Sequence, residues 1–128
     1  MSFEITVDRE FCAGHALRIA GTIEPVHGHN WRVTVGIAGE TLDPDGLLCD
    51  FHAVEERLDG ILAGFVNRHL NEVEPFSRGL NPSAENVARH IADRLANELG
   101  AMEPSARVAW VRVTEAPGCA AIYRRSLG

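Results

Sequence analysis

The spacing of apolar residues changes twice along this chain, and these changes limit the folds that it can adopt. From position 3 to 15 apolar side chains such as Phe3, Ile5 and Val7 occupy alternate positions, and a second alternating run covers 31 to 37. Strict alternation is typical of strands with one buried face. The spacing then becomes three and four residues, as in an amphipathic helix, before alternation returns near the end of the chain. We therefore expect strands at both ends and helices between them.

Two segments carry the helical spacing. The first covers 50 to 68, with Asp50 available as its N-cap. The second begins with Asn81 as the expected cap and Pro82 at the first helical position, and its apolar residues recur every four positions until Gly100. The middle of the chain therefore predicts two helices.

Two further strands follow the helices. Alternation covers 108 to 115, and Pro117-Gly118 then forms a turn into 120 to 124. The order ββααββ predicts an α+β fold in which a four-stranded antiparallel sheet carries both helices on one face. A chain of 128 residues builds one core, so we expect a single domain over 1–128. The open edges of so small a sheet favour a homo-oligomer.

Composition restricts the possible partners. The chain has 12 Lys and Arg against 18 Asp and Glu, a formal net charge of −6 at pH 7, so a basic surface for nucleic acid is not expected. No window approaches the ~18 to 20 apolar residues of a membrane span, and the first residues alternate where a signal peptide would have an apolar block. We expect a cytoplasmic protein without nucleic-acid or membrane partners. Its three cysteines form no C-x-x-C pair and are expected to be buried reduced thiols.

The motif His27-Gly28-His29 is the strongest chemical signal in the sequence. Residues two apart on a strand face the same side, so both imidazoles can bind one ion. His15 has the parity of the apolar residues in its own run, which places all three histidines on the buried face near one end of the strand pair. Three imidazoles with a fourth position open are typical of a catalytic zinc (Zn²⁺) site, with Zn–N distances of about 2.0 to 2.1 Å. The alternative is that they are ordinary core or surface histidines.

Two carboxylates accompany this motif. Glu24 stands three residues before His27, where it would act as a general base beside a metal; otherwise it is a solvated loop residue. Glu115 ends an apolar alternating stretch, where a charge is costly to bury unless it is paired. There it would accept two parallel N–H donors from a guanidine-like ligand edge, as carboxylates do from arginine. The alternative for Glu115 is a surface position or an ion pair with Arg112 or Arg124.

Several motifs occur in order along nearly the whole chain: Phe11-x-x-x-His15, His27-Gly28-His29, Gly46-x-x-x-Asp50-Phe51, His69-Leu70-Asn71, Asn81-Pro82-Ser83-x-Glu85 and Thr114-Glu115. Together they resemble the 6-pyruvoyl-tetrahydropterin synthase and 6-carboxy-tetrahydropterin synthase family. The resemblance implies the tunnelling (T) fold, whose subunits form trimeric barrels that commonly pair into hexamers, with zinc-dependent sites between subunits. It also implies a pterin substrate, usually 7,8-dihydroneopterin triphosphate. His15, His27 and His29 would then be the zinc ligands, and Glu115 would hold the amino-pyrimidine edge of the pterin.

The sequence departs from the family pattern at two places. The family's usual base is a cysteine four residues before the first histidine of His-Gly-His, and Ile23 stands there. Glu24 instead creates the Glu-x-x-His-Gly-His variant, which implies cleavage of the side chain to 6-hydroxymethyl-7,8-dihydropterin, a folate precursor. The family's Asp-His pair is also absent, because Val66 and Asn67 occupy its positions. His69 is the nearby candidate for a catalytic residue; the alternative is a helix-end histidine that interacts with the last carbonyls.

We therefore expect a zinc-dependent carbon-carbon lyase that acts on the side chain of a dihydropterin triphosphate, with Glu24 as base. A retro-aldol cleavage needs fewer proton transfers than the pyruvoyl-forming rearrangement, which favours it where the Asp-His pair is missing. The alternatives are 6-carboxy-tetrahydropterin synthase activity on the queuosine route, the pyruvoyl-forming reaction, and a non-catalytic member that binds zinc and pterin. Three imidazoles would also accept Fe(II) or Co(II). Which arginines bind the triphosphate depends on how subunits meet.

Overall fold

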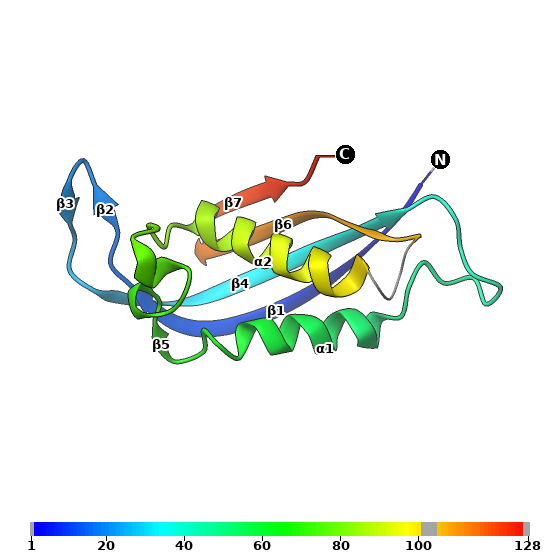
Figure 1. Cartoon of the computed structure of the whole chain (residues 1–128), viewed down its shortest axis with the longest axis horizontal. Helices are drawn as coiled ribbons and strands as arrows, with labels where there is room; N and C mark the ends of the chain where they lie inside the picture. Colours follow the sequence, from blue (N-terminus) through cyan, green and yellow to red (C-terminus); the bar gives the residue numbers. More distant parts are fainter. Residues whose placement is uncertain (1, 101–104, 127–128) are drawn as a thin grey trace.

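The protein is built around one sheet with helices on one side (Figure 1). The structure, a computed structural model, describes residues 2–100 and 105–126. The sheet has five strands in the order β5-β1-β4-β6-β7. Their bounds are Phe3–His15 for β1, His27–Gly39 for β4, Arg68–His69 for β5, Arg107–Ala116 for β6 and Cys119–Arg124 for β7. A separate hairpin of β2, Arg18–Ile19, and β3, Thr22–Ile23, extends from one end of the molecule.

The long strands β1 and β4 pair antiparallel along their whole length. Phe11 lies opposite Trp31, and their rings stack with centroids 5.8 Å apart. Alternate residues of both strands are buried beneath the helices, whereas Glu10 and Arg32 form an ion pair of 2.8 Å on the other face. The same register places His15 directly opposite His27. The alternation in the sequence therefore decides which side chains meet at each end of the sheet.

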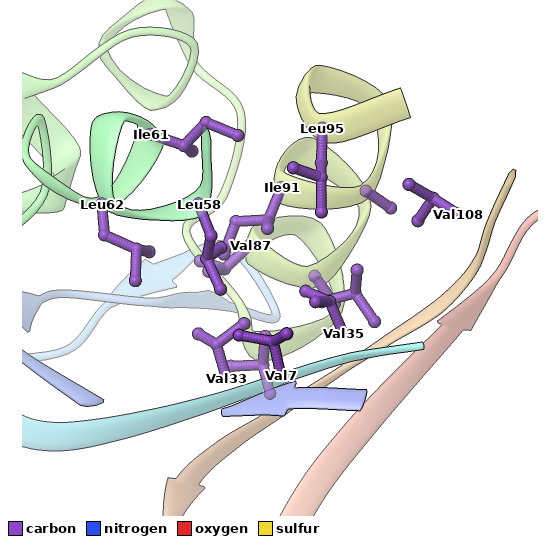
Figure 2. Packing of buried hydrophobic residues seen from close by; sticks show 14 of the residues in the cluster. Val7, Val33, Val35, Leu58, Ile61, Leu62, Val87, Ile91, Leu95 and Val108 are labelled. Atoms are coloured by element: carbon purple, nitrogen blue, oxygen red, sulfur yellow. The ribbon is translucent and has the colours of Figure 1, made fainter. Parts of the chain in front are cut away.

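Helix α1, Phe51–Leu62, and helix α2, Ala84–Gly100, cover the buried face (Figure 1). Figure 2 shows Leu58 of α1 and Ile91 of α2 above Val33 and Val35 of β4, and all four side chains are buried. The predicted α+β fold with both helices on one face is confirmed. No helix among the described residues is long and apolar enough to span a membrane.

The first helix begins as expected and ends earlier than expected. Asp50 is its N-cap, because the Asp50 side chain accepts a hydrogen bond of 2.9 Å from His52 N. The expected end at residue 68 is wrong, since α1 stops at Leu62. Asn67 has a left-handed backbone, with φ of 58°, and its N–H donates to the carbonyl of Cys12 at 2.6 Å. This bond brings the chain to the edge of the sheet, where β5 adds a short parallel strand that the sequence did not predict.

The start of the second helix also differs from expectation. Asn81 is not its cap; Ser83 takes this role, with Oγ accepting from the N–H of Asn86 at 3.2 Å. Pro82 precedes the helix, which begins at Ala84. The reason is that the Asn81 side chain makes two hydrogen bonds with the backbone of Arg18 instead.

The expectation of three buried cysteines is correct only for Cys49. Cys12 and Cys119 are exposed. Cys12 alternates with Phe11 and Ala13, which are buried beneath the helices, so its side chain faces the uncovered side of the sheet.

Candidate metal centre

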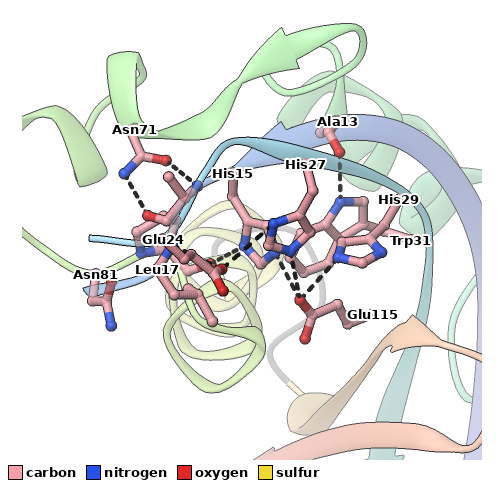
Figure 3. Close-up of polar contacts among 12 residues, drawn as sticks. Ala13, His15, Leu17, Glu24, His27, His29, Trp31, Asn71, Asn81 and Glu115 are labelled. Carbon is pink, nitrogen blue, oxygen red and sulfur yellow. Dashed lines mark hydrogen bonds and ion pairs between the residues drawn. The ribbon is translucent and has the colours of Figure 1, made fainter. Parts of the chain in front are cut away.

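Three histidines and one glutamate meet at the end of the β1–β4 pair. His15 ends β1, His27 and His29 open β4, and Glu115 lies near the end of β6. One ligand atom from each of the four residues lies within 4.8 Å of the others, and we call this group the histidine cluster (Figure 3). The imidazole ring of His15 makes edge contacts with His27 and His29 at 4.6 and 5.2 Å between centroids. The structure thus brings the sequence-predicted ligand residues together on one face.

Backbone carbonyls fix two of the imidazoles. His15 is fully buried, and its Nδ1 lies 2.8 Å from the carbonyl oxygen of Pro82. The Nδ1 of His27 lies 3.1 Å from the carbonyl oxygen of Pro25. A carbonyl oxygen only accepts, so in each neutral ring Nδ1 carries the proton and Nε2 keeps its lone pair. Metal-binding histidines have this arrangement, with the second nitrogen donating to a protein acceptor.

Glu115 lies where the free imidazole nitrogens converge. Its Oε1 is 2.7 Å from Nε2 of His15, 3.1 Å from Nε2 of His29 and 3.9 Å from Nε2 of His27. Among the described residues, Nε2 of His15 and of His29 is buried without a hydrogen-bond partner, because these short contacts lack hydrogen-bond geometry. Nitrogen lone pairs that converge on one point beside a carboxylate fit a divalent cation of the zinc type.

The electrostatics of the cluster favour a neutral imidazole at His29. Burial lowers the pKa of His29 below its usual value; Glu115 opposes this shift, and the neighbouring His15 and His27 add to it. A neutral ring keeps the lone pair that a metal ion needs. The geometry of the donor set and the neutral ring of His29 therefore fit a metal ion.

Glu24 is tied beside the cluster rather than free in solvent. Its Oε1 accepts a hydrogen bond of 3.0 Å from the N–H of Leu17 and lies 3.5 Å from Nδ1 of His27. Its own N–H donates to the carbonyl of Leu17 at 2.9 Å. Among the residues described, no hydrogen bond to Oε2 of Glu24 is found. The loop thus presents a fixed carboxylate with one free oxygen at the edge of the cluster.

Two asparagines hold the chain segment that joins His15 to this carboxylate. The side-chain amide of Asn71 accepts from the N–H of Ala16 at 2.9 Å and donates to its carbonyl at 2.8 Å. Asn81 does the same with Arg18, at 2.8 and 3.0 Å. Leu17 stands between Ala16 and Arg18 in the chain, and its N–H donates to the Glu24 carboxylate, as Figure 3 shows. The sequence reasoning missed this role, and its only signal was the presence of both asparagines in the family motifs.

His69 does not lie at the end of α1. It belongs to β5, pairs in register with Gly14, and has Nδ1 3.6 Å from Oε1 of Glu72. The helix-end interpretation is therefore wrong, because α1 ends before this point. Nε2 of His69 is buried without a hydrogen-bond partner among the described residues. His69 is not part of the histidine cluster, but its strand neighbour Gly14 directly precedes His15.

Two pockets open beside the cluster. The β5 pocket, of about 410 Å³, is bounded by residues of β1, β4 and β5, and the β6 pocket, of about 510 Å³, by residues of β1, β4, β6 and the turn after β6. Gly28, His29 and Asn30 line both. Each pocket is of the size that holds a small ligand.

Comparisons with known proteins agree with this arrangement. Residues 4–126 match the sequence profile of the 6-pyruvoyl tetrahydropterin synthase family. A 6-carboxy-5,6,7,8-tetrahydropterin synthase of Bacillus subtilis (strain 168) is 32% identical, over 99% of this chain and 88% of that protein. A dihydroneopterin monophosphate aldolase of Pyrococcus furiosus is 30% identical, over 77% of this chain and 80% of that protein.

Solved structures share the fold. The 6-pyruvoyl tetrahydropterin synthase of Caenorhabditis elegans superposes with a TM-score of 0.84 at 22% identity, over 98% of this chain and 97% of that one. This likeness confirms the predicted T-fold. Because the sequence profile and the Bacillus subtilis relative cover nearly the whole chain, the chain belongs to the 6-pyruvoyl tetrahydropterin synthase family.

Proposed function

We propose that this protein is a zinc-dependent lyase that cleaves the side chain of 7,8-dihydroneopterin triphosphate to give 6-hydroxymethyl-7,8-dihydropterin. The observation that carries the proposal is the carboxylate of Glu24, which is held 3.5 Å from Nδ1 of His27 at the edge of the histidine cluster. A fixed carboxylate at this place can act as the base of a retro-aldol cleavage.

Two relatives support this choice of base and reaction. The Pyrococcus furiosus protein is named as an aldolase, and an aldolase breaks a carbon-carbon bond of its substrate. A 6-pyruvoyltetrahydropterin synthase of Plasmodium vivax, 20% identical, was solved as a variant in which a catalytic glutamate is replaced by alanine. A glutamate thus serves as a catalytic residue on this fold.

His15, His27 and His29 would hold the zinc ion through their Nε2 atoms. When bound, zinc supplies Lewis acidity that lowers the pKa of substrate hydroxyl groups. Glu24 takes the proton of the C2′ hydroxyl, and the C1′–C2′ bond breaks with its electron pair passing to C1′ and the conjugated ring. C1′ then takes up a proton, so the products are the hydroxymethyl pterin and glycolaldehyde triphosphate. We assign the return of this proton to His69, whose Nε2 is free of hydrogen bonds among the residues described.

We assign Glu115 to substrate binding. Its side chain is 24% exposed and lines the β6 pocket, which a residue that only ligates a metal need not do. A carboxylate accepts two parallel N–H donors, and the amino-pyrimidine edge of a pterin offers such a pair. Oε1 stands at the point where the three Nε2 atoms converge. Glu115 would therefore be available to the pterin only if a cation held by the three histidines took its fourth ligand from another group.

We further propose that the working protein is a homo-oligomer, a trimer or a hexamer. The β2–β3 hairpin and the residues after it expose three large apolar side chains, Ile19, Ile23 and Val26, at 59, 67 and 58%. β7 is the last strand at one side of the sheet and has a free edge. Exposed apolar groups and open edges are surfaces that association covers. Light scattering after size-exclusion chromatography gives the mass that tests this proposal.

One other activity has specific support. The Bacillus subtilis relative is named 6-carboxy-5,6,7,8-tetrahydropterin synthase and matches almost the whole chain. The same substrate would then give 6-carboxy-tetrahydropterin. A single experiment distinguishes the two activities, because their pterin products differ in mass.

The test is to incubate the zinc-loaded protein and its Glu24→Gln variant with 7,8-dihydroneopterin triphosphate and to identify the pterins by chromatography with mass detection. We expect the wild type to form 6-hydroxymethyl-7,8-dihydropterin and the variant to form it about 10² to 10⁴-fold more slowly, with equal zinc content in both. Formation of 6-carboxy- or 6-pyruvoyl-tetrahydropterin would replace the proposed reaction by the corresponding synthase reaction. Substrate that binds without being consumed would identify a non-catalytic pterin-binding protein.

A further inference from the structure

The two pockets beside the histidine cluster meet along one short piece of β4. Gly28, His29 and Asn30 line both pockets, so a ligand that passes over His29 enters one pocket on each side. Gly14 lies opposite Gly28 in the strand register, and a β-carbon added at Gly28 would meet no heavy atom within 4 Å. Because Gly28 alternates with His27 and His29 along β4, this open space lies on the face of the strand opposite their side chains, and both pockets reach Gly28.

The charges of the two pockets are opposite. Two carboxylates, Glu10 and Glu115, line the β6 pocket, and its one arginine, Arg32, is paired with Glu10 at 2.8 Å. No carboxylate lines the β5 pocket among the described residues, and its charged side chain is that of Arg68.

Arg68 is also the arginine that is free to bind an anion there. Its guanidinium group makes no ion pair or hydrogen bond among the described parts of the chain. By contrast, Arg18 donates to the carbonyl of Gly79, and Arg78 and Arg125 pair with carboxylates at 2.7 Å. In a protein with a net charge of −6, an unpaired guanidinium in a pocket is a local site for a negative group.

The proposed substrate has the matching polarity. Its ring edge carries N–H donors, its tail carries phosphates, and the carbon chain that reacts lies between them. The first phosphate is separated from C2′ only by C3′ and one oxygen, so a phosphate must lie close to the place where C2′ meets the histidine cluster. If the carboxylates of the β6 pocket bind the ring, the tail points over His29 into the β5 pocket.

We propose that Arg68 forms a phosphate subsite in the β5 pocket, so that the substrate spans the two pockets with its reacting carbons at His29. This inference rests on the proposed function and adds to it the group that recognises a phosphorylated substrate. A guanidinium group binds phosphate through two parallel N–H bonds, which suits a terminal or bridging phosphate better than a single point charge does.

The experiment compares two substrates that differ only in the tail. Turnover of 7,8-dihydroneopterin triphosphate and of unphosphorylated 7,8-dihydroneopterin is measured for the zinc-loaded wild type, Arg68→Gln, Arg68→Lys and the control Arg78→Gln, whose arginine is exposed and lies outside both pockets. For Arg68→Gln we expect kcat/KM to fall about 10- to 100-fold with the phosphorylated substrate, the range for a lost hydrogen bond between charged groups, and to stay unchanged with the unphosphorylated one. Arg68→Lys recovers part of the loss, and Arg78→Gln changes neither value.

A binding measurement separates this inference from the proposed reaction. Fluorescence titration with the oxidised compounds neopterin and neopterin triphosphate gives Kd values without turnover. We expect Arg68→Gln to weaken the triphosphate by about 10- to 100-fold and to leave neopterin unchanged. An equal effect on both ligands, or no effect on either, would overturn the subsite even if the wild type is active. If the wild type cleaves neither substrate, the proposed function fails, and the titration still decides whether Arg68 binds phosphate.

Discussion

The strand pair β1–β4 has the same alternation along its length but different chemistry at its two ends. In one half the buried face carries Val7, Val35 and Ile37, which pack beneath the helices. At the other end the same face carries His15 and His27, opposite each other in register, with ligand atoms that lie within 4.8 Å of one another. One pattern of inward residues thus supplies a packed core and, at its end, a set of metal-ligand atoms.

The two ends affect stability in opposite ways. We call the half with Val7, Val35 and Ile37 the packed end and the half with the histidines the cluster end. Apolar burial at the packed end stabilises the fold by about 25 cal/mol for each Å² removed from water. At the cluster end, buried nitrogens of His15 and His29 lack hydrogen-bond partners among the described residues, which destabilises the fold without a ligand. The cluster end therefore gains stability when a cation binds, whereas the packed end is stable by itself.

The largest expected effect comes from breaking the cluster end. We expect His27→Ala to abolish stoichiometric zinc binding and to lower turnover by at least about 10³-fold, because the metal contributes several kcal/mol to the barrier. His27 is partly exposed, so the metal-free variant should unfold at a temperature close to that of the metal-free wild type. Zinc content by mass spectrometry and thermal unfolding with and without zinc measure both effects. A variant that still gains thermal stability from stoichiometric zinc would contradict the role of His27.

The next change keeps the metal and removes the base. Glu24→Gln should lower kcat by about 10² to 10⁴-fold, since glutamine still accepts the hydrogen bond of Leu17 but takes no proton. Zinc content should be unchanged. The matched control is Glu40→Gln, an exposed carboxylate on the loop after β4, which should keep full activity. Equal kcat in Glu24→Gln and wild type would show that this carboxylate is not the base.

A change at the packed end should lower stability and leave zinc binding intact. Ile91→Ala removes a fully buried side chain of α2 and should lower the free energy of unfolding by about 2 to 5 kcal/mol. The folded fraction should keep its zinc affinity, because the cluster lies at the other end of the sheet. Denaturant unfolding and zinc titration measure the two quantities, with Asn97→Ala on the exposed side of the same helix as control. A parallel loss of zinc affinity would show that the two ends are coupled.

Alternation explains why much of the fold and three of the cluster residues could be predicted from sequence. Parity alone placed His15, His27 and His29 on the buried face, and the strand register then brought them together. The same local reasoning failed for β5, because two residues are too few to show a period. The hydrogen bond from Asn67 to the carbonyl of Cys12 joins positions far apart in the sequence, and local spacing does not contain such a contact.

The asparagine pair shows the same limit inside the site. A loop asparagine is compatible with a cap, a turn or a solvated side chain, and only the folded chain brings Asn71 and Asn81 to the backbone of Ala16 and Arg18. The position of the Glu24 carboxylate depends on this long-range contact. The sequence thus indicates which side chains can act as bases or ligands, whereas the tertiary contacts fix the positions of these side chains in the site.

Asn71→Ala tests that dependence with a smaller expected effect. The variant loses both hydrogen bonds to Ala16, which displaces the segment that holds Glu24, and kcat should fall about 10- to 100-fold with zinc content unchanged. Asn71→Asp keeps the acceptor for the N–H of Ala16 and should lose less. The exposed Asn97→Ala serves again as control. A rise in KM with constant kcat would argue against a role in positioning the base.

The smallest effect concerns His90, a histidine of α2 that packs between Phe65 and Phe76 at centroid distances of 5.7 and 5.9 Å. Burial lowers the pKa of His90 below its usual value, Arg94 adds to the lowering and Asp93 opposes it. The unfolded chain therefore binds a proton more readily than the folded one. The neutral ring of His90 contributes fully to the free energy of unfolding above the pKa of about 6.5 that histidine has in the unfolded chain. This contribution is lost as pH falls from there toward the lower pKa of His90 in the folded protein.

Replacing His90 by Gln should remove this part of the pH dependence. Denaturant unfolding of the zinc-free protein between pH 7.5 and pH 5, values chosen to bracket about 6.5, gives the difference in unfolding free energy between wild type and variant at each pH. That difference should shrink as pH falls, because only the wild type loses the contribution of the neutral ring. His52→Gln, at an exposed position of α1, should leave the fall of the wild type in place. A difference that stays constant with pH would mean that the ring of His90 titrates equally in both states, and the packing against Phe65 and Phe76 would then act through shape alone.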